Sequence, residues 1–201
     1  MPEIEEDVTQ PSMRKAVRLV AFLNVGYFGV EIAVALAIGS VSLFADSIDF
    51  LEDASINFLI LVALGWAARA RAKLGMVLAG ILLVPGLATI WMAWAKFSTP
   101  VPPAPLALSL AGLGAFIINL TCALVLMRHR KHGGTLTRAA FLSARNDVFA
   151  NIAIVCAGLL TAVTYSAWPD LIVGLGIAAM NAGAAKEVWE AAREEHHAAK
   201  P

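Results

Sequence analysis

Residues 17–69 read VRLVAFLNVGYFGVEIAVALAIGSVSLFADSIDFLEDASINFLILVALGWAAR, two long apolar runs separated by Gly39-Ser40. Each run reaches the roughly 20 residues that a helix needs to cross a hydrocarbon layer of about 30 Å. The pattern predicts two antiparallel membrane-spanning helices, about Val17 to Ile38 and about Val41 to Arg69, joined by a tight turn.

Four further apolar runs have a similar length. We expect helices over about Leu74 to Ala95, Leu106 to Met127, Arg138 to Thr164 and Leu171 to Ala185, with a kink at Pro85 in the first of them. The proline-rich stretch STPVPPAP at 98–105 cannot continue a helix and predicts an extended connection. The predicted fold class is an all-α membrane protein, a six-transmembrane-helix bundle.

The overall composition agrees with this prediction. Of 201 residues, 59% are hydrophobic and only 15% are charged, and the mean hydropathy is +0.74. These values lie well away from those of soluble domains and indicate that lipid is the main solvent. The formal net charge is zero, so the chain has no strongly basic surface and we expect no nucleic acid partner.

Lys and Arg gather in every second connection, which predicts the orientation because short basic loops stay cytoplasmic. One side holds Arg14, Lys15, Arg18, Arg69, Arg71, Lys73, Arg128, Arg130, Lys131 and Arg138, whereas the opposite connections hold only Lys96. We therefore expect both termini in the cytoplasm. The predicted divisions are a cytoplasmic segment over 1–15, a six-helix transmembrane domain over 16–188 and a short charged cytoplasmic tail over 189–201, with no C-terminal cytoplasmic domain.

Acidic residues lie in the second and fifth predicted spans, where an unpaired carboxylate is costly and marks a candidate functional site. The second span holds Asp46, Asp49, Glu52 and Asp53, and the fifth holds Asp147 together with Ser143, Asn146 and Asn151. At about 100° per residue, Asp49 and Asp53 share one helix face, Asp46 lies near it and Glu52 points further round.

The polar residues of the fifth span also form a stripe. Ser143, Asp147 and Asn151 follow one another at intervals of four and share a face, with Asn146 at its edge and Arg145 nearly opposite. Counted at about 1.5 Å per residue, Asp53 lies about 18 Å from the outer surface and Asp147 about 12 Å from the inner one. In a layer of about 30 Å these depths coincide, so the two stripes are predicted to meet.

Several carboxylates with amide and hydroxyl oxygens near the bilayer centre form a hard-oxygen site suited to a divalent cation. Two structural questions stay open at this point. Asn119 and Thr121 on the fourth span are typical of interhelical hydrogen bonding and can serve packing alone. Asn24 and Glu31 on the first span share a face, and the second question is whether that face lines the same cation pathway.

Two Asp on two helices can also perform acid and base catalysis. The Gly-rich context expected around such a pair is absent around Asp147, so we do not expect an enzyme.

Three segments resemble the cation diffusion facilitator family of metal/proton antiporters. They are the stretch from Asn24 through Glu31 to Asp46, the pair Asp49 and Asp53 four residues apart, and the stretch from Leu142 through Asp147 to Asn151. The likeness covers the whole six-span region, including Pro169-Asp170 before the last span. It implies a transporter that exports a divalent metal cation in exchange for protons, as a homodimer in the lipid bilayer, with the plasma (inner) membrane of a bacterium as the expected location.

The resemblance also implies a ligand set, because four side chains of the second and fifth spans hold a zinc-like ion in the family. By position these are Asp49, Asp53, Asp147 and Ser143, with Asn146, Asn151 and Asp46 as additional candidates. Ser143 stands where the family usually has His, and three carboxylates with a hydroxyl make a harder site that favours iron, manganese or cobalt over zinc. The sequence does not single out one substrate among Zn, Fe, Mn, Co and Cd.

The alternative hypothesis is a family-like membrane protein that no longer transports and instead senses metal or serves as a partner subunit. It is motivated by Ser143 and by the expected lack of the cytoplasmic domain that the family commonly carries.

Overall fold

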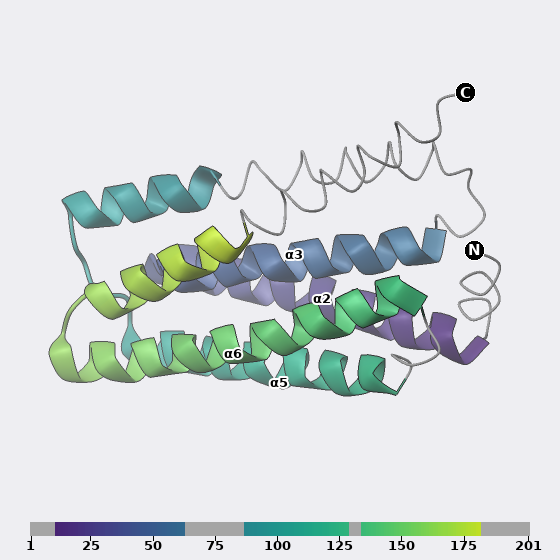
Figure 1. Cartoon of the computed structure of the whole chain (residues 1–201). Helices are drawn as coiled ribbons and strands as arrows, with labels where there is room; N and C mark the ends of the chain where they lie inside the picture. The colour runs from purple at the N-terminus through teal and green to yellow at the C-terminus, as the bar shows by residue number, and fades with distance from the viewer. Residues whose placement is uncertain (1–10, 63–86, 129–133, 182–201) are drawn as a thin grey trace, which may run out of the picture.

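The computed structural model describes residues 11–62, 87–128 and 134–181. Within these ranges the chain forms six helices and no strand: α2 (Pro11–Ile38), α3 (Val41–Val62), a helix over 87–98, α5 (Pro105–Met127), α6 (Gly134–Thr164) and a helix over 168–181. Figure 1 shows α2, α3, α5 and α6 side by side along a common direction. The predicted all-helical class is confirmed.

Three described segments are long and apolar enough to cross a membrane, namely Pro11–Ile38, Pro105–Met127 and Ser143–Thr164 within α6. Helix α3 has a similar length, 22 residues or about 33 Å, but it carries the four acidic residues from Asp46 to Asp53. Its charge, not its length, separates it from the other three. Six spans and two cytoplasmic termini stay predictions.

The turn between α2 and α3 is as tight as predicted. Gly39 has a φ of 63°, a left-handed conformation that suits a residue without a Cβ. Ser40 follows, and its Oγ accepts a hydrogen bond from the Leu43 backbone N–H at 3.2 Å. This bond satisfies a free amide at the start of α3, as an N-cap serine does.

Some helix ends differ from the prediction. Helix α2 begins at Pro11 instead of Val17, because Met13 and Val17 form a buried face that packs against Ile56 and Leu61 of α3. Helix α6 begins at Gly134 and the last helix at residue 168, four and three residues before their predicted starts. The predicted extended connection is found over 99–104. The predicted kink at Pro85, the basic residues at 69–73 and the charged tail from 189 lie outside the described residues.

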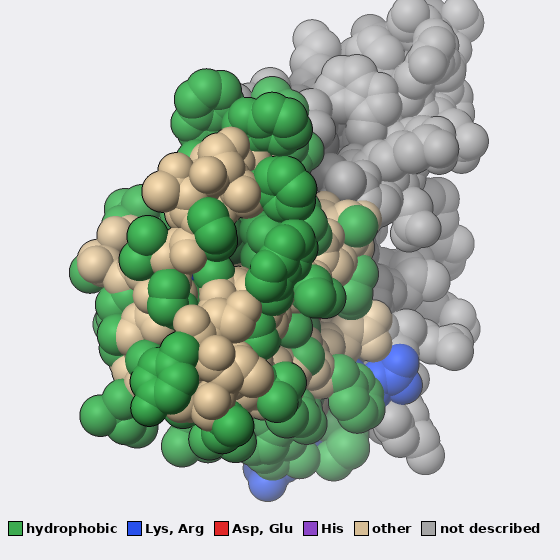
Figure 2. All heavy atoms as spheres, turned by 90° about the vertical axis from the view of Figure 1, so that its left-hand side faces the viewer, with side chains coloured by type: hydrophobic (Ala, Val, Ile, Leu, Met, Phe, Trp, Pro, Cys, Tyr) green, Lys and Arg blue, Asp and Glu red, His purple; other side chains and the backbone are tan. Residues whose placement is uncertain are grey.

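The surface and the interior have the polarity of a membrane protein. Large apolar side chains such as Phe22, Trp91, Leu106 and Val163 are between 71% and 78% exposed, whereas Asn24, Glu31 and Asp46 are completely buried. Figure 2 views one end of the bundle, where hydrophobic side chains cover much of the described surface and no Asp or Glu is seen. Water would not tolerate so large an apolar surface, but lipid does.

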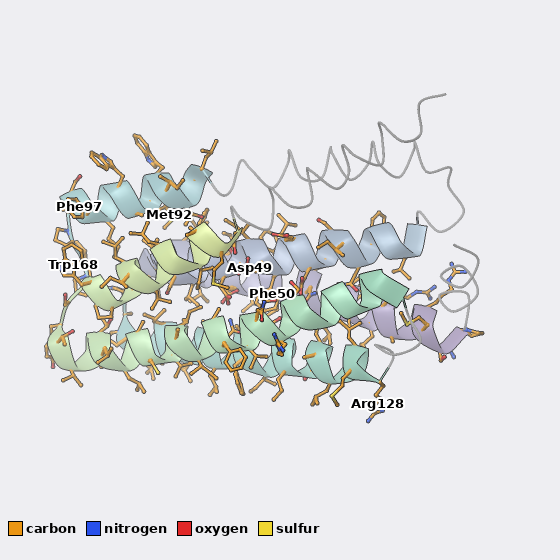
Figure 3. The ribbon with its side chains drawn as sticks, in the orientation of Figure 1. Asp49, Phe50, Met92, Phe97, Arg128 and Trp168 are labelled. Carbon is orange, nitrogen blue, oxygen red and sulfur yellow. The ribbon has the colours of Figure 1, made fainter. Side chains whose placement is uncertain are left out.

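The two ends of the bundle differ in chemistry. Figure 3 places Arg128 at one end and Phe97 and Trp168 at the other. We call these the basic end, where α2 and α6 begin, and the aromatic end, where α3 and α5 begin. The rings of Phe97 and Trp168 meet edge to face with centroids 5.8 Å apart. Aromatic residues are enriched at membrane interfaces, so this contact agrees with a membrane boundary at the aromatic end.

Candidate metal centre

The acidic face of α3 meets the polar face of α6, as the sequence predicted. The two helices run in opposite directions and are in contact. Ser143 Oγ donates a hydrogen bond to Asp53 Oδ1 at 3.0 Å, and Asn151 Nδ2 donates to Asp46 Oδ2 at 2.6 Å. These two bonds join the helices at two levels, and at about 1.5 Å per residue the levels lie roughly 10 to 12 Å apart.

Asp49 and Asp147 lie between these two levels. Asp49 falls between Asp46 and Asp53 on α3, and Asp147 falls midway between Ser143 and Asn151 on α6. Figure 3 shows Asp49 near the middle of the bundle's length. The structure therefore brings all four predicted ligands to one helix interface, with Asp53 and Ser143 in direct contact.

The carboxylates of this interface are largely removed from solvent and have no basic partner among the described residues. Asp53 is 4% exposed and Asp147 is 8% exposed, Asp46 is completely buried, and Asp49 is half-buried. Among pairs of described residues, the one ion pair joins Lys96 and Asp170 at the aromatic end. Ionised buried carboxylates without a counter-ion are expensive, so these side chains must either be protonated or be compensated by a cation.

Asn151 orients a neighbouring carboxylate. Its amide nitrogen donates to Asp46, and its amide oxygen accepts a hydrogen bond from Asn119 Nδ2 at 3.0 Å. Because Asp46 accepts and does not donate when ionised, the Asn151 nitrogen must face it. Asn119 thus acts as an interhelical hydrogen-bond donor, as expected, whereas Thr121 is exposed and bonds its own helix at Ile117 O.

Asn146 is not brought to the interface. It is exposed on α6, and its Oδ1 accepts a long contact of 3.4 Å from Arg145 Nη2. Of the additional candidate ligands, the structure therefore places Asp46 and Asn151 at the interface and Asn146 away from it.

The predicted ligands face one another without closing around a point. Among the described residues, no three His, Cys, Asp or Glu side chains converge closely enough to hold a metal ion. Oxygen ligands approach hard cations to about 2.0 to 2.6 Å, so binding here requires the acidic side chains of α3 and α6 to draw together. Whether they do so around a metal stays a prediction.

Helix α2 adds buried polar groups at the same interface. Asn24 and Glu31 are both completely buried, and the electrostatic neighbours of Glu31 are Asp46 and Asp49. Tyr27, between them on α2, donates its hydroxyl proton to Ala111 O at 2.6 Å. The structure places Glu31 beside the acidic residues of α3, whereas the expectation that this face lines the same path stays a prediction.

A second charged site lies at the aromatic end, and sequence reasoning missed it. Asp170 accepts hydrogen bonds from Ser40 Oγ at 2.6 Å, Ser42 Oγ at 2.7 Å and the backbone N–H groups of Val41 and Ser42 at 3.0 and 3.1 Å. Lys96 Nζ donates to it at 2.9 Å and to Gly39 O at 2.5 Å. We call this cluster the Asp170 latch, because it ties the start of α3 to the helices over 87–98 and 168–181.

The sequence did contain a signal for the latch. Lys96 is the lone basic residue of the predicted outer connections, and Asp170 is an acid directly after Pro169 at the start of the last span. Opposite charges on one membrane side favour a pair, but nothing in the spacing of the two residues predicts that they meet.

Comparison with known proteins places the chain in a family. Among curated proteins, no significant match is found. The family model of the cation efflux transmembrane domain matches residues 17–194, which is most of the chain and includes α3, α6 and the acidic interface between them. The chain therefore belongs to the cation efflux family, the cation diffusion facilitators, which makes it an integral membrane protein of a family of cation transporters.

Proposed function

We propose that this protein exports a divalent metal cation by exchange for protons and binds the cation between α3 and α6. The ligands in this proposal are Asp49, Asp53, Asp147 and Ser143. The observation that carries it is the buried interface of carboxylates joined by the Ser143 to Asp53 hydrogen bond, with no basic partner among the described residues. Cation efflux membership supports the transport of a cation.

The donor types favour a hard divalent ion. Three carboxylates and a hydroxyl supply oxygen only, a set suited to manganese, iron or cobalt more than to zinc, which prefers nitrogen and sulfur ligands. The hydrogen bond from Ser143 shows that position 143 faces Asp53. A ligand at this position can therefore reach the same ion as the α3 carboxylates.

Exchange follows from the chemistry of carboxylates. The same oxygen atoms bind either a proton or a metal ion, so protonation competes with metal binding. A site that opens alternately to the cytoplasm and to a more acidic exterior would release metal outside and carry protons inward. In this proposal the protein works as a homodimer in the plasma membrane of a bacterium and performs no covalent catalysis.

Proteoliposomes test the proposal. Purified full-length protein is reconstituted with a Mn²⁺ indicator and a pH indicator inside the vesicles, and Mn²⁺ is added outside under an imposed pH gradient. Wild-type protein should carry Mn²⁺ in and protons out together. Asp53→Asn and Asp147→Asn should each lower the Mn²⁺ flux roughly tenfold or more, the equivalent of about 1.4 kcal/mol of lost binding.

Glu52→Gln is the matched control. Glu52 precedes Asp53 on α3, carries the same charge and points away from the shared face of Asp49 and Asp53. Its substitution should leave most of the flux. Full flux in both Asp53→Asn and Asp147→Asn would refute the proposal, and Mn²⁺ flux without proton movement would refute the exchange.

A further inference from the structure

Two acidic side chains at the aromatic side of the α3–α6 interface lie outside the proposed ligand set. Glu31 of α2 and Asp46 of α3 are both 0% exposed. The two carboxyl groups are electrostatic neighbours. Glu31 is seven residues before the end of α2, and Asp46 is five residues after the start of α3. At about 1.5 Å per residue both lie roughly 8 to 10 Å from the aromatic end.

Most of the oxygen atoms of this pair have no hydrogen-bond partner. Within the described part of the chain, both Oε atoms of Glu31 and Oδ1 of Asp46 are buried and without a donor. Buried carboxylate oxygens normally accept two or more hydrogen bonds, and leaving them unmade is costly. Two adjacent buried carboxyl groups can satisfy these atoms either by sharing a proton or by binding a cation.

The hydrogen-bond donors near this pair do not neutralise it. Tyr27, one turn before Glu31, gives its proton to Ala111 O. Asn24, two turns before Glu31, accepts a contact from Cys122 Sγ at 3.6 Å through Oδ1, and its buried Nδ2 has no hydrogen-bond partner among the residues that the structure describes. Asn151 Nδ2 serves the other oxygen of Asp46. The surrounding side chains thus orient the carboxylates without neutralising them.

We propose that Glu31 and Asp46 form a second cation site, separate from the Asp49, Asp53 and Asp147 site and nearer the aromatic end, which takes the transported divalent cation. Asp46 lies three residues before Asp49 and seven before Asp53 on α3. Along the helix axis it is therefore about 4 to 5 Å from the nearer ligand of the first site and about 10 Å from the farther one. Asn151 is a positioning residue here, because its bond to Asp46 Oδ2 leaves Oδ1 for the ion. This inference rests on the proposed function and adds a step to the path.

Metal stoichiometry of the full-length protein tests the second site. Equilibrium dialysis against Mn²⁺, with the bound metal quantified, is carried out on wild type, Glu31→Gln and Asp46→Asn. Both substitutions keep side-chain size and remove charge. Each should lose one equivalent of bound Mn²⁺ relative to wild type and keep the other. Glu52→Gln, the matched control on α3, should lose none.

The outcomes separate this inference from the proposed function. Asp53→Asn should also lose one equivalent, and Asp53→Asn combined with Glu31→Gln should lose two. If Glu31→Gln and Asp46→Asn both bind as much Mn²⁺ as wild type, the pair holds a shared proton instead of a metal and the second site is refuted. If Asp53→Asn and Asp147→Asn both leave Mn²⁺ binding and flux unchanged, the proposed function fails instead. If Glu31→Gln or Asp46→Asn does not run as a single species in size-exclusion chromatography, the other of these two variants is used in its place.

Discussion

The Asp170 latch predicts an asymmetry between two single substitutions. Lys96→Met removes the ammonium but leaves Asp170 with four donors, the hydroxyls of Ser40 and Ser42 and two backbone amides at the start of α3. Asp170→Asn leaves the Lys96 ammonium, 7% exposed, with no anionic partner and only neutral oxygens such as Gly39 O as acceptors. Asp170→Asn therefore leaves the buried Lys96 charge with less compensation than Lys96→Met leaves the buried Asp170 charge.

The magnitudes follow from the buried pair. Breaking such a pair on one side costs about 3 to 5 kcal/mol. We assign the lower end to Lys96→Met, because the remaining donors still stabilise the carboxylate, and the upper end to Asp170→Asn. At about 2 to 4 °C per kcal/mol for a chain of this length, the melting temperature should fall by about 6 to 12 °C and about 10 to 20 °C respectively.

The assay is thermal unfolding of the purified protein in nanodiscs, followed by circular dichroism. Lys15→Met is the matched control, since Lys15 is exposed at the basic end and the substitution is the same; it should change stability by no more than about 0.5 kcal/mol. Equal shifts for Lys96→Met and Asp170→Asn, or shifts no larger than that of Lys15→Met, would refute the account of the latch.

Two further predictions concern helix packing. Gly174→Ala should lower stability by about 1 to 3 kcal/mol, because a Cβ there would lie 2.7 Å from the Ser42 backbone nitrogen, whereas Gly176→Ala, with nothing within 4 Å, should be neutral or slightly stabilising in the same melting assay. Asn119→Leu should cost about 1 to 3 kcal/mol by leaving the buried Asn151 Oδ1 without its donor; an unchanged melting temperature would contradict the proposed chain of hydrogen bonds.

The fold class and the pairing of α3 with α6 were accessible from the sequence for simple reasons. Apolar length predicts helices that span a membrane, and intervals of four place Ser143, Asp147 and Asn151 on one face. The depth estimate for Asp53 and Asp147 relied only on helix rise. The estimate correctly brought the two stripes together, but the observed bond sets Asp53 level with Ser143. Asp147 is four residues further along α6, so it lies about 6 Å from the level at which the estimate placed it.

Helix ends and side-chain pairing were less accessible. Hydropathy placed the start of α2 at Val17, because Arg14 and Lys15 interrupt the apolar run, but Met13 on the opposite face packs against α3 and extends the helix to Pro11. Likewise, the spacing of Asn24 and Glu31 predicts that they share one face of α2. It does not predict that Glu31 approaches Asp46, because that contact depends on how α2 and α3 cross. Asn146 shows the same limit, since a position at the edge of the α6 stripe proved exposed.

The central claim is that position 143 of α6 and the α3 carboxylates hold one metal ion. Calorimetric titration of Zn²⁺ into Ser143→His, compared with wild type, tests it most directly, with Asn146→His as the matched control on the exposed face of the same helix. An imidazole that points into the site completes a ligand set that zinc prefers, so the account predicts zinc binding roughly tenfold tighter or more in Ser143→His and unchanged in Asn146→His. Zinc affinity in Ser143→His equal to that of wild type would contradict it.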